Sequence, residues 1–222
     1  MGGGVGLTWH SPVRIATDNS MYAMPETAIG FFTDVGGSYF LPRVKNGDFS
    51  LGLYLGLTGQ RIIGRDLVKY GIATHFIKQE NLDHLHEVLL KNVTKDSTTE
   101  EIEDIVQDHS DATAAVGEIK YHDEIRQIFQ NDSIQACMDR LEQSNSEFAS
   151  MTKKMLAPMS PLSLAVVFEQ IKRGSKMSIK EVFEMEFKIA AGFCQHTEFF
   201  EGVRALLVDK DKQPKWRFKT VH

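Results

Sequence analysis

The stretches GGGVGL (residues 2–7) and MPETAIGFFTDVGGSYFLPR (residues 24–43) carry the most information about this chain. Glycines that open a helix can present backbone N–H groups to a developing negative charge. Glu26 follows a predicted strand, and Asp34 lies eight residues further on, just before a pair of glycines. Burial in a cleft can raise the pKa of such carboxyls into a range that suits acid–base chemistry. Two acids in one cleft can divide the work, one attacking or deprotonating and the other positioning water.

Each of these features also has a purely structural interpretation. Glu26 would then pair with an arginine, Asp34 would cap a helix that opens at Ser38, and the glycines would form a flexible leader. Residues 2–7 lack the Lys-Ser/Thr ending of a phosphate-binding loop, and no G-x-G-x-x-G follows a strand. Spacing alone therefore leaves the catalytic and structural interpretations open and gives nucleotide binding little support.

Composition narrows the classes of function. The chain has 222 residues, 42% of them hydrophobic, enough for a substantial core, and its net charge of −5 argues against a nucleic-acid partner. The sequence has no basic cluster that would favour binding to a membrane surface, and no apolar run long enough to span a bilayer. Cys137 and Cys194 are far apart, which favours free thiols in a reducing compartment. His84 and His86 lack the spacing of a metal site, so we expect surface histidines and no metal.

The chain divides by composition into three segments. Residues 1–77 begin with predicted strands at 13–17 and 21–25 and continue with a helix that stops at Gly59. We expect a second helix from residue 61, a glycine stop at Gly71, and then another strand. Residues 78–150 are acidic and helical, and residues 151–222 form a helical C-terminal region.

The C-terminal region contains strong helix-start signals. Ser160 can cap a helix with Pro161 in its first turn, and Ser178 repeats the device. In the acidic segment, threonine and glutamate have the spacing of a capping box. Glu201 and Arg204 can form a local ion pair. The apolar residues of the helix after Ser178 predict a largely buried helix: Val182, Phe183, Met185, Phe187, Ile189 and Ala190.

Taken together, these motifs resemble the enoyl-CoA hydratase/isomerase (crotonase) superfamily. The resemblance rests on residues 2–7 and 24–43, on LGLTGQRIIGRDLVKYGIATHFI (55–77), and on MSPLSLAVVFEQIKRG (159–174). It continues through EMEFKIA (184–190) and EFFEGVRALLVDKDKQPKW (198–216), and it is weakest in residues 78–150. Within the superfamily the chain is most similar to the branch that hydrolyses 3-hydroxyisobutyryl-CoA, with 3-hydroxypropionyl-CoA as a second candidate substrate.

The resemblance implies an α/β, crotonase-like fold, here with a strand-poor core. Hydratases of the superfamily carry a first catalytic glutamate at the position of Gly6, so the two-glutamate hydration machinery is not expected here. Their second glutamate matches Glu26. Asp34 stands where hydratases commonly have glycine, which is the pattern of the hydrolase branch.

The resemblance also implies a mechanism. The amide of Gly3 would hold the thioester carbonyl as one of two oxyanion donors, and Gly4 would line the substrate. Glu26 would attack the carbonyl or activate water, while Asp34 would bind the acyl hydroxyl or position the hydrolytic water. The ligand is an acyl-CoA thioester, so no separate cofactor is expected. A homo-oligomer and a mitochondrial location in valine breakdown are implied in the same way.

The few strands and the missing second oxyanion loop lead us to expect that part of the family's N-terminal core is absent from this sequence. Loss of one oxyanion donor costs about 3 kcal/mol of transition-state stabilisation. We therefore expect this chain alone to be poorly active or inactive and to associate. A hydratase or isomerase and a non-catalytic interaction subunit remain the alternatives.

Overall fold

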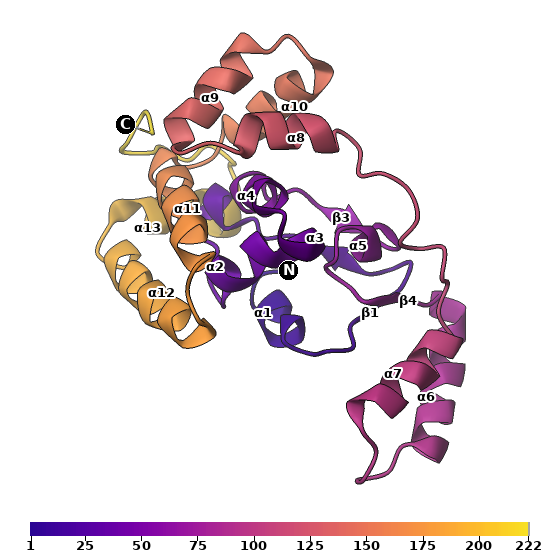
Figure 1. Cartoon of the computed structure of the whole chain (residues 1–222). Helices are drawn as coiled ribbons and strands as arrows, with labels where there is room; N and C mark the ends of the chain where they lie inside the picture. The colour runs from indigo at the N-terminus through magenta and orange to yellow at the C-terminus, as the bar shows by residue number, and fades with distance from the viewer. Residues whose placement is uncertain (222) are drawn as a thin grey trace. The chain divides into compact units, whose positions relative to one another are not determined.

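The computed structural model describes residues 1–221, and the chain forms two compact units (Figure 1). The first unit contains residues 1–7, 23–60 and the chain from Lys120 onward. The second contains residues 8–22 and 61–119. Glu26, Asp34 and the start of the glycine motif all belong to the first unit. The three-part division of the sequence at residues 77 and 150 stays a prediction.

The first unit is almost entirely helical. Its central helix is α4, which is buried along nearly its whole length and packs against η2, α8, α10 and α11. A helix that is apolar on every side requires such a shell of neighbours. Its elements are α1 (Gly3–Trp9, which begins here), η1 (Glu26–Ile29), α2 (Gly37–Phe40), η2 (Leu41–Arg43), α3 (Val44–Gly47), α4 (Phe49–Thr58), α8 (His122–Phe129), α9 (Ile134–Gln143), α10 (Glu147–Leu156), α11 (Pro161–Gly174), α12 (Ile179–Phe193), α13 (Thr197–Val203) and the π-helical turn η4 (Arg204–Val208).

The predicted helix boundaries in this unit are confirmed. Helix α4 ends before Gly59, which has a left-handed backbone with φ 62°. The hydroxyl of Ser160 accepts the N–H of Ser163 at the start of α11, with Pro161 in the first turn. Ser178 forms a complete capping box with Glu181 at the start of α12. Local hydrogen-bonding chemistry therefore sets these boundaries, as the sequence indicates.

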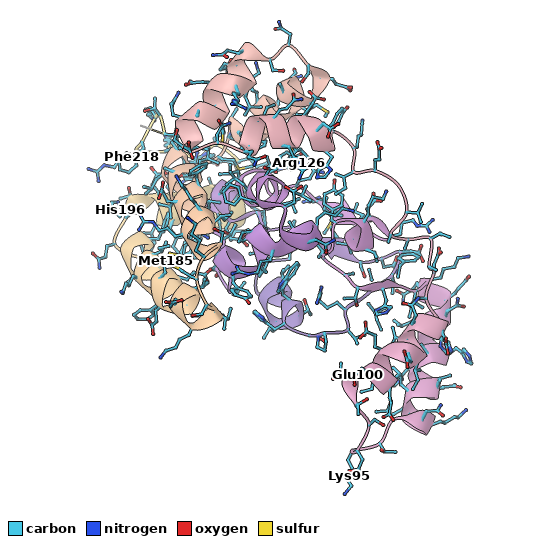
Figure 2. All side chains as sticks on the ribbon, in the orientation of Figure 1. Lys95, Glu100, Arg126, Met185, His196 and Phe218 are labelled. Atoms are coloured by element: carbon cyan, nitrogen blue, oxygen red, sulfur yellow. The ribbon has the colours of Figure 1, made fainter. Side chains whose placement is uncertain are left out.

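The second unit holds all the strands among residues 1–221. Strand β1 (Ile15–Ala16) pairs in parallel with β4 (His75–Phe76), and β2 (Met21–Tyr22) pairs antiparallel with β3 (Ile62–Ile63). The remaining elements are helical and are α5 (Asp66–Lys69), η3 (Gln79–Asn81), α6 (Leu82–Asn92) and α7 (Thr99–Asp108). Ile77, Leu85 and Val106 form a small core between the strands and the α6–α7 pair. A capping box at Thr98, also predicted, starts α7 just beyond the loop that carries Lys95 (Figure 2).

Two sequence predictions are wrong in detail here. The strands predicted at 13–17 and 21–25 are only two residues long, because each has a single short partner and Pro25 has no N–H to donate. The helix predicted from residue 61 is preceded by β3 and limited to α5, because Gly64 adopts a left-handed backbone with φ 59°. Gly71 does end this helix, before β4, as expected.

No helix within residues 1–221 has the length and apolar character that are needed to cross a membrane.

Candidate active site

Glu26 is a buried carboxyl whose second oxygen lacks a hydrogen bond. It opens the 3₁₀ turn η1, and its side chain is only 6% exposed. Oε2 has no hydrogen-bond partner among residues 1–221. The turn itself is held firmly, since the Thr27 hydroxyl donates to the Leu57 carbonyl (3.1 Å) and the Ser160 N–H donates to the Thr27 carbonyl (3.1 Å). The backbone of the turn is thus well held, while Oε2 of the carboxyl it carries lacks a hydrogen bond.

Burial, with a smaller contribution from the negative charge of Asp34, raises the pKa of Glu26 to about 8, against the opposing effects of its own backbone N–H and of the N-terminal amine. The structural alternative for this residue, an ion pair with an arginine, does not occur within the described chain. Glu26 is therefore mostly neutral at pH 7, and its ionised form is a stronger base than an ordinary carboxylate.

The first glycines lie beside this carboxyl. A Cβ placed on Gly2 would lie 3.4 Å from Glu26 Oε1, so Glu26 approaches the backbone that immediately precedes α1. The Gly2 N–H donates to the Ala23 carbonyl (3.3 Å), which ties this backbone to the segment leading into η1. A Cβ on Gly3 or Gly4 would meet nothing within 4 Å, so open space borders these two residues. Gly2 thus borders the carboxyl, and the two glycines that follow it border open space.

Asp34 lies at the start of a tight turn. It is half-buried, and burial raises its pKa, while its own backbone N–H opposes the rise. The carbonyl of Asp34 accepts the Gly37 N–H (2.8 Å). Val35 follows with φ 51° and Gly36 with φ 87°. A β-branched residue in the left-handed region is an outlier that costs about 1–3 kcal/mol and often marks a functional site.

The structural alternative for Asp34 does not hold. Helix α2 has Gly36 at its N-cap and receives no cap from a nearby side chain. Instead, the carboxylate of Glu186 on α12 accepts the Gly36 N–H at Oε2 (2.8 Å) and the Ser38 N–H at Oε1 (2.9 Å). Because the backbone donors of α2 are occupied by Glu186, the Asp34 side chain is not needed as a cap.

Gly6 is required by close packing. A Cβ at this position would lie 2.4 Å from the Val35 carbonyl oxygen and 2.6 Å from the Val35 Cβ. No side chain fits there while the turn keeps its conformation. The left-handed turn after Asp34 thus occupies the space that a glutamate at position 6 would need.

Comparison with known proteins identifies the family. A family model described as enoyl-CoA hydratase/isomerase matches residues 1–222. The chain belongs to the enoyl-CoA hydratase/isomerase family. It is 45% identical over 221 residues to a mitochondrial 3-hydroxyisobutyryl-CoA hydrolase of Dictyostelium discoideum and 41% identical over 229 residues to that of Danio rerio. These alignments cover 97% and 100% of this chain but 56% and 58% of the relatives, so the chain spans little more than half their length.

A solved structure supports the same fold for this family member. The carnitinyl-CoA dehydratase of Mycobacterium thermoresistibile superposes with a TM-score of 0.84 at 28% identity, over 100% of this chain and 61% of that one. The crotonase-like fold predicted from the sequence is thereby confirmed. The roles assigned to Gly3, Gly4, Glu26 and Asp34 remain predictions.

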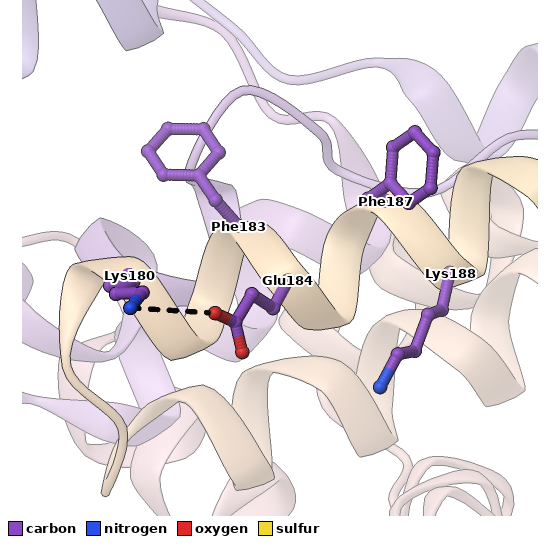
Figure 3. A pocket seen from close by; sticks show the side chains of 5 residues that line it. All are labelled: Lys180, Phe183, Glu184, Phe187 and Lys188. Carbon is purple, nitrogen blue, oxygen red and sulfur yellow. Dashed lines mark ion pairs between the residues drawn. The ribbon is translucent and has the colours of Figure 1, made fainter.

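Glu186 is the site residue that sequence reasoning missed. The helix that carries it, α12, was predicted to bury its aromatic residues, which is wrong for Phe183 and Phe187, 47% and 76% exposed. These two flank an open hollow on α12 with Lys180, Glu184 and Lys188, and Lys180 lies 4.0 Å from Glu184 (Figure 3). The buried face instead carries Val182 and Glu186, one helical turn apart. A charged residue on the buried face of an amphipathic helix was the available signal.

The remaining candidates have structural roles. Burial raises the pKa of the Cys137 thiol to about 12, which makes it a poor nucleophile, and Cys194 is exposed. His84 is exposed and contacts the ring of His109. No cluster of three or more metal-ligating side chains occurs in residues 1–221. The predicted ion pair between Glu201 and Arg204 is confirmed at 2.8 Å.

Proposed function

We propose that this chain carries acid–base groups of a thioesterase that hydrolyses 3-hydroxyisobutyryl-CoA to the free acid and CoA. The observation that supports this most strongly is the buried Glu26 carboxyl, which has a pKa of about 8, an Oε2 without a hydrogen-bond partner among residues 1–221, and Gly2 next to its Oε1. The names of the relatives, which are 3-hydroxyisobutyryl-CoA hydrolases, support the same substrate. The smaller 3-hydroxypropionyl-CoA is a second candidate, since it carries the same hydroxyl.

Two routes are open to Glu26. In the first, a carboxylate oxygen bonds to the thioester carbon, the C–S bond breaks, and CoA leaves as a thiolate that takes up a proton. Water then cleaves the resulting mixed anhydride, which returns the carboxyl and releases the acid. In the second, Glu26 accepts a proton from water while the water oxygen attacks the thioester carbon. Both routes need the ionised form, so the rate should rise with pH until the Glu26 pKa is passed.

The neighbouring groups complete the proposal. The N–H of Gly3, at the start of α1, has no hydrogen-bond acceptor among residues 1–221 and would donate to the oxyanion that forms on the thioester carbonyl. The open space at Gly4 would admit the thioester. Asp34 would accept the hydrogen bond of the acyl 3-hydroxyl or position the hydrolytic water. Coenzyme A enters as part of the substrate, so the proposal includes no separate cofactor.

The test is a single-turnover assay with the protein in excess over 3-hydroxyisobutyryl-CoA, in which free CoA thiol is followed. We expect Glu26→Gln to lower the rate at least ~100-fold, because an amide can neither attack nor accept the proton. Glu169→Gln is the matched control, since it removes an exposed carboxylate of α11 that lies 3.4 Å from Arg173. Wild-type rates in Glu26→Gln would refute the proposal.

The same assay separates the alternatives. A hydratase would add water to an enoyl-CoA without releasing thiol, and the filled space at Gly6 argues against that reaction. A non-catalytic interaction subunit would show neither reaction. Because both hydrolase relatives are named as mitochondrial, we also propose a mitochondrial location. A homo-oligomer remains a prediction that sedimentation would test.

A further inference from the structure

The turn that carries Asp34 is held by side chains from two helices far along the chain. On one side, the Gln170 amide of α11 donates to the Thr33 carbonyl (2.7 Å) and hydroxyl (2.6 Å). On the other, Glu186 of α12 binds the N–H groups of Gly36 and Ser38. Figure 1 shows α11 and α12 beside α2, which this turn opens. Asp34 thus lies between two fixed points, and neither of them binds its carboxylate.

The turn needs this support. Val35 and Gly36 both have left-handed backbones, and α2 is only four residues long and has no cap of its own. Gly36 and Ser38 are buried, so without Glu186 their N–H groups would lie away from water with no acceptor. The conformation of the turn therefore depends on a carboxylate roughly 150 residues away in sequence.

Glu186 itself is committed to the backbone. It is only 4% exposed, and each of its oxygens accepts one amide of the turn. Burial raises its pKa, the two amides oppose that rise, and the negative charge of Asp34 adds to it. A carboxylate enclosed in this way is suited to fixing a backbone and poorly suited to meeting a substrate.

We propose that Glu186 is a positioning residue for hydrolysis: it locks the backbone of residues 35–38 so that the Asp34 carboxylate keeps its working position next to Glu26. This inference rests on the function proposed above. Because a displacement of about 1 Å at a catalytic group can cost about 100-fold in rate, loss of the lock should slow the chemical step while leaving binding of the CoA portion intact.

The experiment compares Glu186→Gln with Glu181→Ala in the single-turnover assay and by amide hydrogen exchange. Gln keeps the volume, but its NH₂ group faces one of the two backbone donors, so that hydrogen bond is lost. We expect amide exchange at Gly36 or Ser38 to accelerate and the saturating rate to fall ~100-fold, with substrate affinity changed less than about threefold. Glu181→Ala removes a capping group from the start of the same helix. It should change neither the amide exchange at Gly36 and Ser38 nor the saturating rate.

Glu186→Asp serves as the conservative variant and should recover part of the rate, because it restores an acceptor for both amides. Faster exchange in Glu186→Gln with wild-type hydrolysis would overturn the inference, because the lock would then be structural only. Unchanged exchange would overturn it as well. If the wild-type protein releases no thiol, the proposed function fails, and this inference fails with it.

Discussion

Two buried glutamates in the first unit are satisfied to very different degrees. Glu198, at the start of α13, is 1% exposed, and Oε2 accepts the Ser160 hydroxyl (2.5 Å) while Oε1 accepts the N–H groups of Arg217 (2.7 Å) and Phe218 (3.2 Å). Glu26 is 6% exposed, yet its Oε2 accepts no hydrogen bond from any group in residues 1–221. Burial alone therefore does not distinguish a structural carboxyl from a candidate catalytic one. What separates them is whether the buried charge has its hydrogen bonds.

The hydrogen-bonded carboxylate of Glu198 has a structural role. It joins the C-terminal segment to α11 and α13, where Phe218 also faces His196 (Figure 2). The Trp216 indole N–H donates to the Pro158 carbonyl (2.9 Å) in the same region. Residues that follow the last helix are thereby packed onto the unit. The Glu26 carboxyl, in contrast, has an oxygen, Oε2, with no hydrogen-bond partner among residues 1–221. Backbone hydrogen bonds and the Thr27 hydroxyl hold the turn η1 instead.

The largest effect on stability is expected for Glu198→Ala. Three donors would lose their acceptor, and we expect the free energy of unfolding to fall by about 3 kcal/mol. Urea denaturation measures this. Glu142→Ala is the control: its exposed carboxylate lies 3.4 Å from Lys153, and its loss should cost less than about 1 kcal/mol. Equal losses in the two variants would show that Glu198 does not fasten the C-terminal segment.

A smaller effect distinguishes two glycines on α1. Gly6→Ala would place its Cβ against the Val35 carbonyl and should destabilise the fold by about 1–3 kcal/mol. Gly4→Ala meets open space in a helical backbone, so it should stabilise the fold by about 0.5–1 kcal/mol. Thermal unfolding of the two variants measures the difference. If Gly6→Ala were as stable as Gly4→Ala, α1 would not be closely packed against the turn after Asp34.

Sequence reasoning singled out candidate residues more readily than it described their surroundings. The glycine motif, Glu26 and Asp34 could be singled out as candidates because acids beside glycine turns suit acid–base chemistry and because their motifs resemble a known family. The capping boxes and the stop at Gly59 were predictable because they depend on hydrogen bonds between near neighbours.

The rest depends on contacts between distant segments. Glu186 meets Gly36 across 150 residues, and no local pattern encodes that distance. The buried face of α12 was misjudged because Phe183 and Phe187 look like core residues until the position of α2 is known. Periodicity marks a helix, and only tertiary packing decides which face is covered.

The central claim is that Glu26 is a perturbed carboxyl coupled to Asp34, and the most direct measurement is an NMR titration of the Glu26 side-chain carbon in the wild type and in Asp34→Asn. The wild type should titrate with a pKa of about 8, and Asp34→Asn should titrate lower, because the variant removes a charge that disfavours ionisation of Glu26. Since the folded state then prefers the neutral form, Glu26 should also make unfolding easier as pH rises from about 4.5 to 8. A Glu26 pKa near 4.5, or one that does not respond to Asp34→Asn, would contradict the account.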